Sequence, residues 1–218
     1  MELQIRSLFQ TPKIFDRIAR AKGPLAFIDE SFRAPSQDHD SFYIVAAAVI
    51  DKAIVLEVRK ELRRRVRHGT WHTTEAGRSQ VGQQKIRELS AYLATVVKPV
   101  VVVVDQLQKS DRSAEAGRAK ALRALLVELA TEHVYLTGTV VYEKRIPGYM
   151  QAHDDLIIGQ IRREKGAASS LNVIGLSTKS EPLLWIPDII AWAFRQQYLK
   201  DGGGYFSELA KIAKVIHI

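Results

Sequence analysis

The sequence predicts an α/β domain, a mixed β-sheet with helices on both faces, from three observations. Its 218 residues suit one domain, or one domain with an appendage. Its composition, 46% hydrophobic and 26% charged, is that of a globular protein and excludes disordered, collagen-like and membrane-spanning chains. A pair of apolar runs leads the chain, and strand-like and helix-like segments then alternate, as in sheets covered on both faces.

The first half of the chain predicts a hairpin followed by two helices. Residues 25–29 form a short apolar run entered through Gly23-Pro24, and residues 42–50 form a second run rich in Val and Ile. The polar stretch 33–40 joins them, which favours an antiparallel pair. Apolar residues at helical spacing then predict helices over residues 53–66 and 83–97, with a loop over residues 69–77.

The second half alternates more regularly. Residues 100–104 are five consecutive valines, as expected of a strand buried on both faces. Helix and strand patterns then follow one another, and Pro187 suits the first position of the last long helix. The predicted segments are helix 113–132, strand 134–142, helix 149–164 (with His153-Asp154-Asp155 as a capped helix start), strand 171–176 and helix 187–199.

The predicted boundaries are an N-terminal helical extension over residues 1–22, the α/β domain over 23–200, and a C-terminal helix over 205–218. The segment Asp201-Gly202-Gly203-Gly204 separates that helix from the domain. Its apolar residues are expected to dock on the domain or on a second copy in a homodimer. These residues are Phe206, Leu209, Ile212, Val215 and Ile216.

The charge balance is the one unusual feature of the composition. Lys and Arg number 32 against 24 Asp and Glu, a net charge of +8, which favours a polyanionic partner such as nucleic acid. The absence of cysteine excludes a disulfide scaffold, thiolate zinc sites and a cysteine nucleophile, and it fits a reducing cytoplasm. The longest apolar run, residues 99–104, is too short to span a bilayer.

Three acids stand at the ends of apolar segments. Asp29 closes the first strand, and Asp105 follows the five valines. Ligands commonly bind where the strands of α/β sheets end, although each acid alone is also explained by a turn at the strand exit. Asp188 opens an apolar helix and must be paired, hydrogen-bonded or metal-bound, since an isolated buried charge is costly. The dipole of the first helical turn is the local alternative for Asp188.

His72 and Glu75 lie in the loop predicted between the two helices of the first half. They suit metal ligation or proton transfer, or else a solvated loop. Asp29, Glu75, Asp105 and Asp188 together predict a cluster that a cation must compensate, because crowded carboxylates repel one another. Oxygen ligands suit Mg²⁺ or Mn²⁺, and a pair of such ions about 4 Å apart can activate a water that cleaves a phosphodiester.

Short segments at both ends of the domain resemble a bacterial family catalogued as domain of unknown function (DUF) 3800. These segments read FIDES (27–31), FYIVAAAVI (42–50) and IPDIIAWA (186–193). The resemblance implies a ribonuclease H-like fold with a nuclease-type carboxylate site. In that site Asp29, Asp105 and Asp188 are metal ligands, and Glu30 is a further or alternate ligand. The resemblance also suggests Glu75 as a catalytic acid close to His72, although here the His precedes the Glu, against the usual order of the family.

A basic stripe is predicted on the helix over residues 53–66 and just beyond it. Arg59, Arg63 and Arg67 recur every four residues, with Arg64 beside them. Such a stripe can follow a phosphate backbone and makes binding salt-dependent. A solvated face with local Glu–Arg pairs is the alternative.

The sequence therefore predicts a nuclease dependent on Mg²⁺ or Mn²⁺, acting on DNA or RNA. A nucleic-acid-binding or assembly component with the same fold and no productive site is the second hypothesis. A hydrolase of small phosphorylated molecules is the third, and it would not need the basic stripe.

Overall fold

The structure is a computed structural model. It describes residues 18, 21, 23–36, 40–67, 69–132, 137–145, 148–164, 166–178, 181–200 and 202–218. The predicted N-terminal extension over residues 1–22 lies almost entirely outside these residues.

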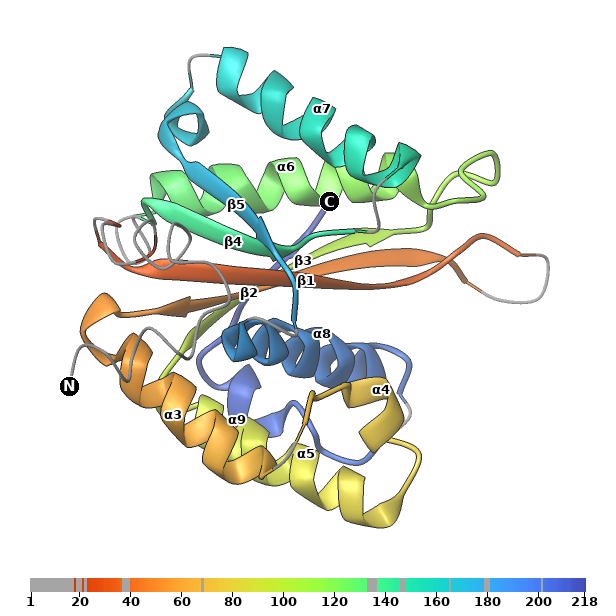
Figure 1. Cartoon of the computed structure of the whole chain (residues 1–218). Coiled ribbons are helices and arrows are strands. Elements are labelled where there is room, and N and C mark those ends of the chain that lie inside the picture. The colour runs from red at the N-terminus through yellow and green to blue at the C-terminus, as the bar shows by residue number, and fades with distance from the viewer. Residues whose placement is uncertain are drawn as a thin grey trace.

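A six-stranded mixed sheet forms the centre of the molecule (Figure 1), in the order β5-β4-β1-β2-β3-β6. Strands β1, β2 and β3 form an antiparallel meander, whereas β4 lies parallel to β1 and β5 parallel to β4. The C-terminal β6 runs parallel to β3 at the opposite edge. The strands are β1 (Leu25–Arg33), β2 (Phe42–Ile50), β3 (Lys98–Asp105), β4 (Thr139–Glu143), β5 (Asn172–Leu176) and β6 (Lys214–His217).

Helices cover both faces of this sheet. Figure 1 shows α6 and α7 on one face and the remaining labelled helices, with α8 closest to the sheet, on the other. All nine residues of β2 are buried, which is why β2 is an uninterrupted apolar run without polar alternation. The helices are α3 (Val55–Val66), α4 (Thr73–Ala76), α5 (Gln80–Leu93), α6 (Glu115–Thr131), α7 (Tyr149–Arg163), α8 (Trp185–Tyr198) and α9 (Ser207–Ala210).

Two hydrophobic cores lie on either side of the sheet, and β1 contributes alternate residues to each. Leu25 and Phe27 pack on the α8 side, whereas Ala26 and Ile28 pack on the α6 and α7 side. Because side chains alternate along a strand, residue 29 faces α8 and residue 30 faces the opposite helices. Strand β1 continues through both acids to Arg33, so this alternation places Asp29 and Glu30 on opposite faces within the strand.

The predicted mixed α/β sheet with helices on both faces is confirmed. The meander of β1 to β3 is extended beyond β1 by the parallel strands β4 and β5. The predicted hairpin over residues 25–50 is also present, with Leu25 opposite Ile50 and Arg33 opposite Phe42.

Several predicted boundaries are wrong. The loop over residues 69–77 contains the short helix α4, and α5 ends at Leu93 because the chain must extend into β3. Pro187 is the third residue of α8, where its missing N–H costs no hydrogen bond. The segment His153-Asp154-Asp155 lies inside α7, which begins at Tyr149.

The predicted helix over residues 205–218 is also wrong in its second half. Helix α9 ends at Ala210, and residues Lys214–His217 form β6 on the edge of β3. The segment therefore docks on its own domain, with Phe206 and Leu209 in the core on the α8 side. The backbone hydrogen bonds that β3 offers at its open edge favour a strand over a longer helix.

Candidate functional site

An open cleft of about 260 Å³ lies on the α8 side of the sheet, at the middle of β1 and the carboxyl end of β4. Four carboxylates from four different elements contribute to its wall, together with His72 and Arg78. The lining residues are Asp29, Trp71, His72, Thr73, Thr74, Glu75, Arg78, Glu143, Thr178 and Asp188. Sites of α/β sheets are expected at this end of the strands.

Asp29 and Glu143 come from adjacent parallel strands. The last pair of their ladder is Ile28 with Tyr142, so Asp29 and Glu143 are the next residue of each strand. Val141 packs in the core on the α8 side, which places Glu143 on the same face as Asp29. The parallel register thus sets two acids side by side at the mouth of the cleft.

Asp188 lies in the first turn of α8 and is held by the segment that contains α4. Its Oδ2 accepts a hydrogen bond from the backbone N–H of Thr73 at 2.9 Å and another from the Thr73 hydroxyl at 2.8 Å. The Thr73 hydroxyl in turn accepts a hydrogen bond from Trp71 Nε1 at 2.7 Å. Thr73 is fully buried, so its contacts fix α4 against α8.

The remaining members of the cleft are held less tightly. Thr178, just beyond β5, donates a hydrogen bond from its hydroxyl to Glu143 Oε1 at 2.9 Å. His72 and Glu75 are exposed at the start of α4, and both line the cleft. Asp29, His72, Glu75 and Asp188 therefore all line one cleft, and the roles assigned to them stay predictions.

The cleft is electrostatically unfavourable for its own acids. Burial, followed by the negative charges of Glu30, Asp188 and Glu143, raises the pKa of Asp29 well above its ordinary value. Burial is also the largest cause that raises the pKa of Asp188, and it outweighs the hydrogen bonds from Thr73. Crowded, partly buried carboxylates of this kind favour a proton or a cation as a partner.

The donor set suits a hard divalent cation. Asp29 Oδ1 accepts the N–H of Glu30 at 2.8 Å and Asp188 Oδ2 accepts from Thr73, while no described residue donates a hydrogen bond to the second oxygen of either. Carboxylate oxygens anchored in this way are the ligands that Mg²⁺ and Mn²⁺ prefer. Across the residues described, no three His, Asp or Glu side chains converge on one metal position, so the acids must rotate to share an ion.

The prediction that Asp105 joins these acids is wrong. Asp105 pairs with Phe42 of β2, and Phe42 pairs with Arg33 of β1, which lies four residues beyond Asp29. Strand β2 therefore separates β3 from β1. Two strand spacings of about 4.8 Å and four residues of about 3.4 Å put the Cα atoms of Asp29 and Asp105 roughly 17 Å apart. Asp105 instead accepts a hydrogen bond from the Tyr198 hydroxyl and contacts His217 Nδ1 at 2.8 Å.

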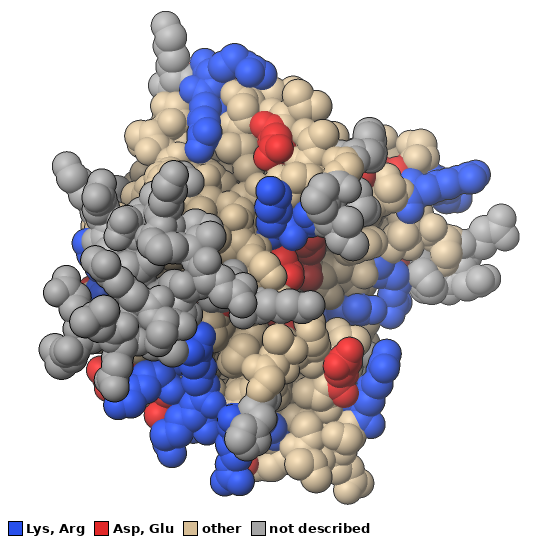
Figure 2. Space-filling model, viewed as in Figure 1, with Lys and Arg blue, Asp and Glu red and all other residues tan. Residues whose placement is uncertain are grey.

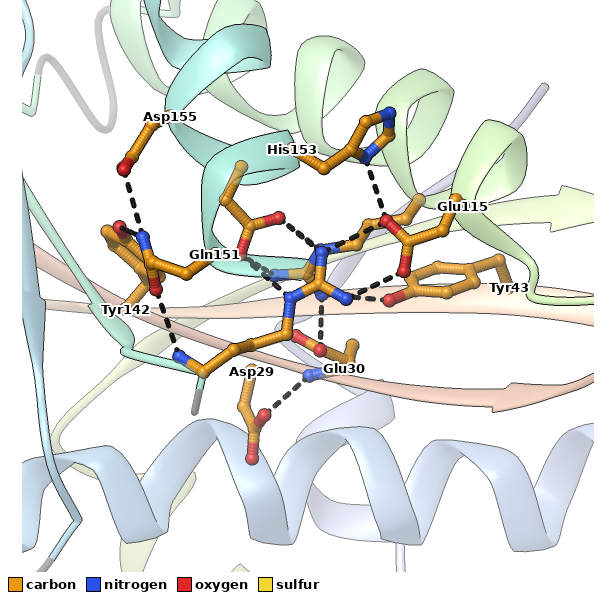
Figure 3. Close-up of polar contacts among 11 residues, drawn as sticks. Asp29, Glu30, Tyr43, Glu115, Tyr142, Gln151, His153 and Asp155 are labelled. Carbon is orange, nitrogen blue, oxygen red and sulfur yellow. Dashed lines mark hydrogen bonds and ion pairs between the residues drawn. The ribbon is translucent and has the colours of Figure 1, made fainter. Parts of the chain in front are cut away.

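The prediction that Glu30 is a further metal ligand is also wrong. Figure 3 shows Asp29 pointing away from the polar network in which Glu30 takes part. Glu30 lies on the α6 and α7 side, where its carboxylate forms an ion pair with Arg118. The one-residue step along β1 reverses the face of the sheet, so Asp29 and Glu30 cannot line the same cleft.

The predicted arginine stripe does not exist as one surface. Arg59 is only 4% exposed and makes two hydrogen bonds to Glu181, at 2.8 and 3.0 Å. Arg63 is half-buried, and Arg67 is exposed at the end of α3. Arg64 is exposed but paired with Glu61. Figure 2 shows basic side chains gathered at the lower left, where α3 lies in Figure 1, so a basic surface remains without Arg59.

Two members of the cleft were missed by the sequence analysis. Glu143 directly follows the predicted strand 134–142 and is the last residue of β4, and Arg78 follows α4. The signal for Glu143 is the same as for Asp29, a carboxylate directly after an apolar strand. Asp105 shows that pattern more strongly, and the local sequence does not reveal which strand lies next to β1.

Within the part of the chain that the structure describes, no helix has the length and apolar character required to cross a membrane.

No family model matches the sequence, and no curated protein is significantly similar to it. Among solved structures the chain is similar to Bst-RNase HIII in complex with Mn²⁺, at 14% identity and a TM-score of 0.43, over 86% of this chain and 54% of that one. It is also similar to a point mutant of Bst-RNase HIII, at 12% identity and a TM-score of 0.44, over 89% and 57% of the two chains. The chain thus spans just over half the length of either structure. Identity this low says nothing about which residues act.

Proposed function

We propose that the protein is a nuclease that hydrolyses nucleic-acid phosphodiester bonds at the cleft described above, with Mg²⁺ or Mn²⁺. The observation that carries the proposal is the convergence of Asp29, Glu143 and Asp188, from β1, β4 and α8, on one open cleft. The structure does not describe a separate cationic partner for each of these three partly buried acids. Burying their charges costs free energy on folding, and a bound cation offsets that cost.

In this proposal the acids of the cleft are the metal ligands, and neighbouring residues hold them in place. Asp29, Glu143 and Asp188 would hold the cation, and Thr73 and Thr178 keep two of these carboxylates in place. A divalent cation held there would lower the pKa of a bound water and stabilise the leaving oxygen.

The rim of the cleft supplies groups for the substrate. Arg78 can contact a phosphate oxygen, since a guanidinium binds phosphate in two-point geometry. His72 and Glu75, exposed at the rim, are placed to move protons to and from solvent. The net charge of +8 favours a polymeric anion over a small phosphate ester.

The test is a cleavage assay with end-labelled single-stranded and double-stranded DNA and RNA in millimolar Mg²⁺ or Mn²⁺. Asp29→Asn, Glu143→Gln and Asp188→Asn should each lower the rate by at least about 100-fold, the upper range for loss of even an outer-shell partner. Asp105→Asn is the matched control and should retain full activity, because Asp105 does not line the cleft.

Three results would contradict the proposal. Cleavage that survives in all three cleft variants would place the activity elsewhere or in a contaminant. Nucleic-acid binding without cleavage, and without a thermal shift in Mn²⁺, would favour a non-catalytic binding component with the same fold. Cleavage of small phosphate esters alone would favour the third hypothesis.

A further inference from the structure

A network of buried and partly buried charged side chains lies directly across the sheet from the acidic cleft, between α6, α7 and β1 (Figure 3). It joins two arginines to three carboxylates. Its members are Glu30, Tyr43, Glu115, Arg118, Arg145, His153 and Asp154. The proposed function uses none of them.

Arg118 of α6 is the centre of the network. It is 4% exposed, and its guanidinium donates hydrogen bonds to both oxygens of Asp154, at 2.8 and 3.1 Å. It donates a third to the Tyr43 hydroxyl at 2.8 Å and forms an ion pair with Glu30. All these partners lie in separate elements, so a single side chain ties α6 to α7, β1 and β2.

Arg145 occupies the outer side of the same carboxylate. It follows β4 and donates two hydrogen bonds to Asp154, at 2.6 and 2.9 Å. It donates two more to Glu115, at 2.7 and 3.1 Å, and Glu115 also contacts His153 Nδ1 at 2.8 Å. Asp154 is fully buried and is therefore shared by two arginines, one from α6 and one from the exit of β4.

The two strand residues of the network are neighbours of the two acids at the mouth of the cleft. Glu30 follows Asp29 in β1, and its backbone N–H holds Asp29 Oδ1 at 2.8 Å. Arg145 stands two residues beyond Glu143. The pairing of β1 with β4 ends at Ile28 and Tyr142, whereas β1 stays paired with β2 as far as Arg33 and Glu143 stays paired with Leu176 of β5. Beyond Ile28 and Tyr142, other strands therefore hold β1 and β4 in the sheet, and no further pairing joins them to each other.

We propose that this network is a clamp that holds β1 and β4 together beyond their last paired residues and so keeps Asp29 and Glu143 side by side. The inference rests on the proposed function, because it assigns Glu30, Arg118 and Arg145 as positioning residues for that site. Two carboxylates placed beside each other repel, and the repulsion acts to separate the two strands where their pairing stops. Two-point arginine–carboxylate pairs on the opposite face oppose that separation in a defined geometry.

The variant that tests the clamp is Arg118→Lys. Lysine keeps the positive charge but presents one compact ammonium in place of the planar fork, so it cannot hold Asp154, Tyr43 and Glu30 at once. Arg59→Lys is the matched control. It breaks a buried two-point pair of the same kind, between α3 and Glu181, that lies outside the network.

The first readout requires neither metal nor activity. Amide hydrogen exchange of the metal-free protein, followed in peptides that cover residues 29–31 and 143–145, should be at least several-fold faster in Arg118→Lys than in the wild type. Exchange in α8 should stay close to that of the wild type. Arg59→Lys should leave the exchange of residues 29–31 and 143–145 unchanged.

The second readout is Mn²⁺ affinity, measured from the free Mn²⁺ signal in electron paramagnetic resonance well below the unfolding temperature. Arg118→Lys should weaken binding about 10-fold or more, as the loss of groups that orient metal ligands does. Arg59→Lys should retain the wild-type affinity. A network that only stabilised the packing of α6 on α7 would leave Mn²⁺ affinity unchanged.

The outcomes separate the clamp from the proposed function. Unchanged exchange at residues 29–31 and 143–145 in Arg118→Lys overturns the clamp, whatever the metal result. Faster exchange there supports it. A wild-type protein that binds no Mn²⁺ overturns the proposed metal site, and the exchange data still decide whether the network holds the strand ends. If Arg118→Lys does not fold, Glu30→Gln, which keeps a hydrogen-bonding side chain toward Arg118, replaces it in both measurements.

Discussion

Thr73 and Asp188, 115 positions apart in the chain, make two hydrogen bonds through one carboxylate oxygen. This contact forms one wall of the acidic cleft, because it attaches the segment that carries His72 and Glu75 to the first turn of α8. Trp71 extends the contact through its indole N–H, which donates to the Thr73 hydroxyl.

Replacing Thr73 by Val should destabilise the protein by about 1–3 kcal/mol, because it leaves Trp71 Nε1 without its acceptor and removes one donor to Asp188. Urea denaturation measures the change. Thr73→Ser keeps the hydroxyl and should retain most of the stability. Equal losses in the Val and Ser variants would show that packing of the methyl group, rather than the hydrogen bonds, matters at this position.

Asp29→Asn should stabilise the metal-free protein at neutral pH. The pKa of Asp29 is raised in the folded state by burial and by Glu30, Asp188 and Glu143, so the folded state binds the proton more tightly than the unfolded state does. The wild type therefore loses stability as the pH rises above the ordinary value of 3.8, and Asn avoids that loss. A pKa raised by one unit corresponds to about 1.4 kcal/mol.

The measurement is the free energy of unfolding of both proteins between pH 4 and pH 7. Asp105→Asn is a control for which the opposite change in the free energy of unfolding is expected. Although burial acts against it, hydrogen bonds from Tyr198 and His217 lower the pKa of Asp105, so loss of that carboxylate should destabilise the protein near neutral pH. An Asp29→Asn variant that is less stable than the wild type at pH 7 would contradict the electrostatic description of the cleft.

Glu181→Ala should destabilise the protein by about 3–5 kcal/mol, since it leaves the guanidinium of Arg59 buried without its carboxylate. Glu208→Ala removes the carboxylate of an exposed ion pair with Lys211 and should cost no more than about 1 kcal/mol. Chemical denaturation of the two variants compares them directly. Similar small effects would mean that Arg59 finds another partner or reaches solvent when Glu181 is absent.

Gly82→Ala should disturb the turn between α4 and α5. A Cβ at this position would lie 2.0 Å from the backbone oxygen of Ala76, and a backbone atom cannot move aside as a side chain can. The expected cost is about 1–3 kcal/mol, together with a change in the rim formed by Glu75 and Arg78. Thermal unfolding measures the loss of stability. Gly166→Ala is the control, because a Cβ there meets no atom within 4 Å.

The sequence predicted the character of most elements correctly, because periodicity is a local property. Five consecutive valines predict a strand buried on both faces, and β3 is one, with residues 100–103 fully buried. The segment after Gly204 shows the limit of local patterns. Its apolar spacing resembles a helix, yet residues Lys214–His217 pair with β3, since an open strand edge offers hydrogen bonds that the local sequence does not reveal.

The candidate site also combines features that the local sequence reveals with features that depend on the order of the strands. An acid directly after an apolar strand, or in the first turn of an apolar helix, marks Asp29 and Asp188 from the sequence alone. Whether a further acid joins them depends on which strand lies next to β1. That neighbour is β4, which brings Glu143, while β2 separates β1 from the strand of Asp105.

The sequence by itself determined a mixed α/β domain with acids at strand ends and a basic surplus, because hydrophobic period and residue type are local. Only the tertiary structure decided that Glu143 replaces Asp105 in the cleft, that Glu30 faces the opposite side, and that Arg59 is buried against Glu181. These outcomes depend on strand order, on the face that a side chain takes, and on partners far away in the chain. Such relationships arise from long-range pairing and packing, which no pattern within a short segment contains.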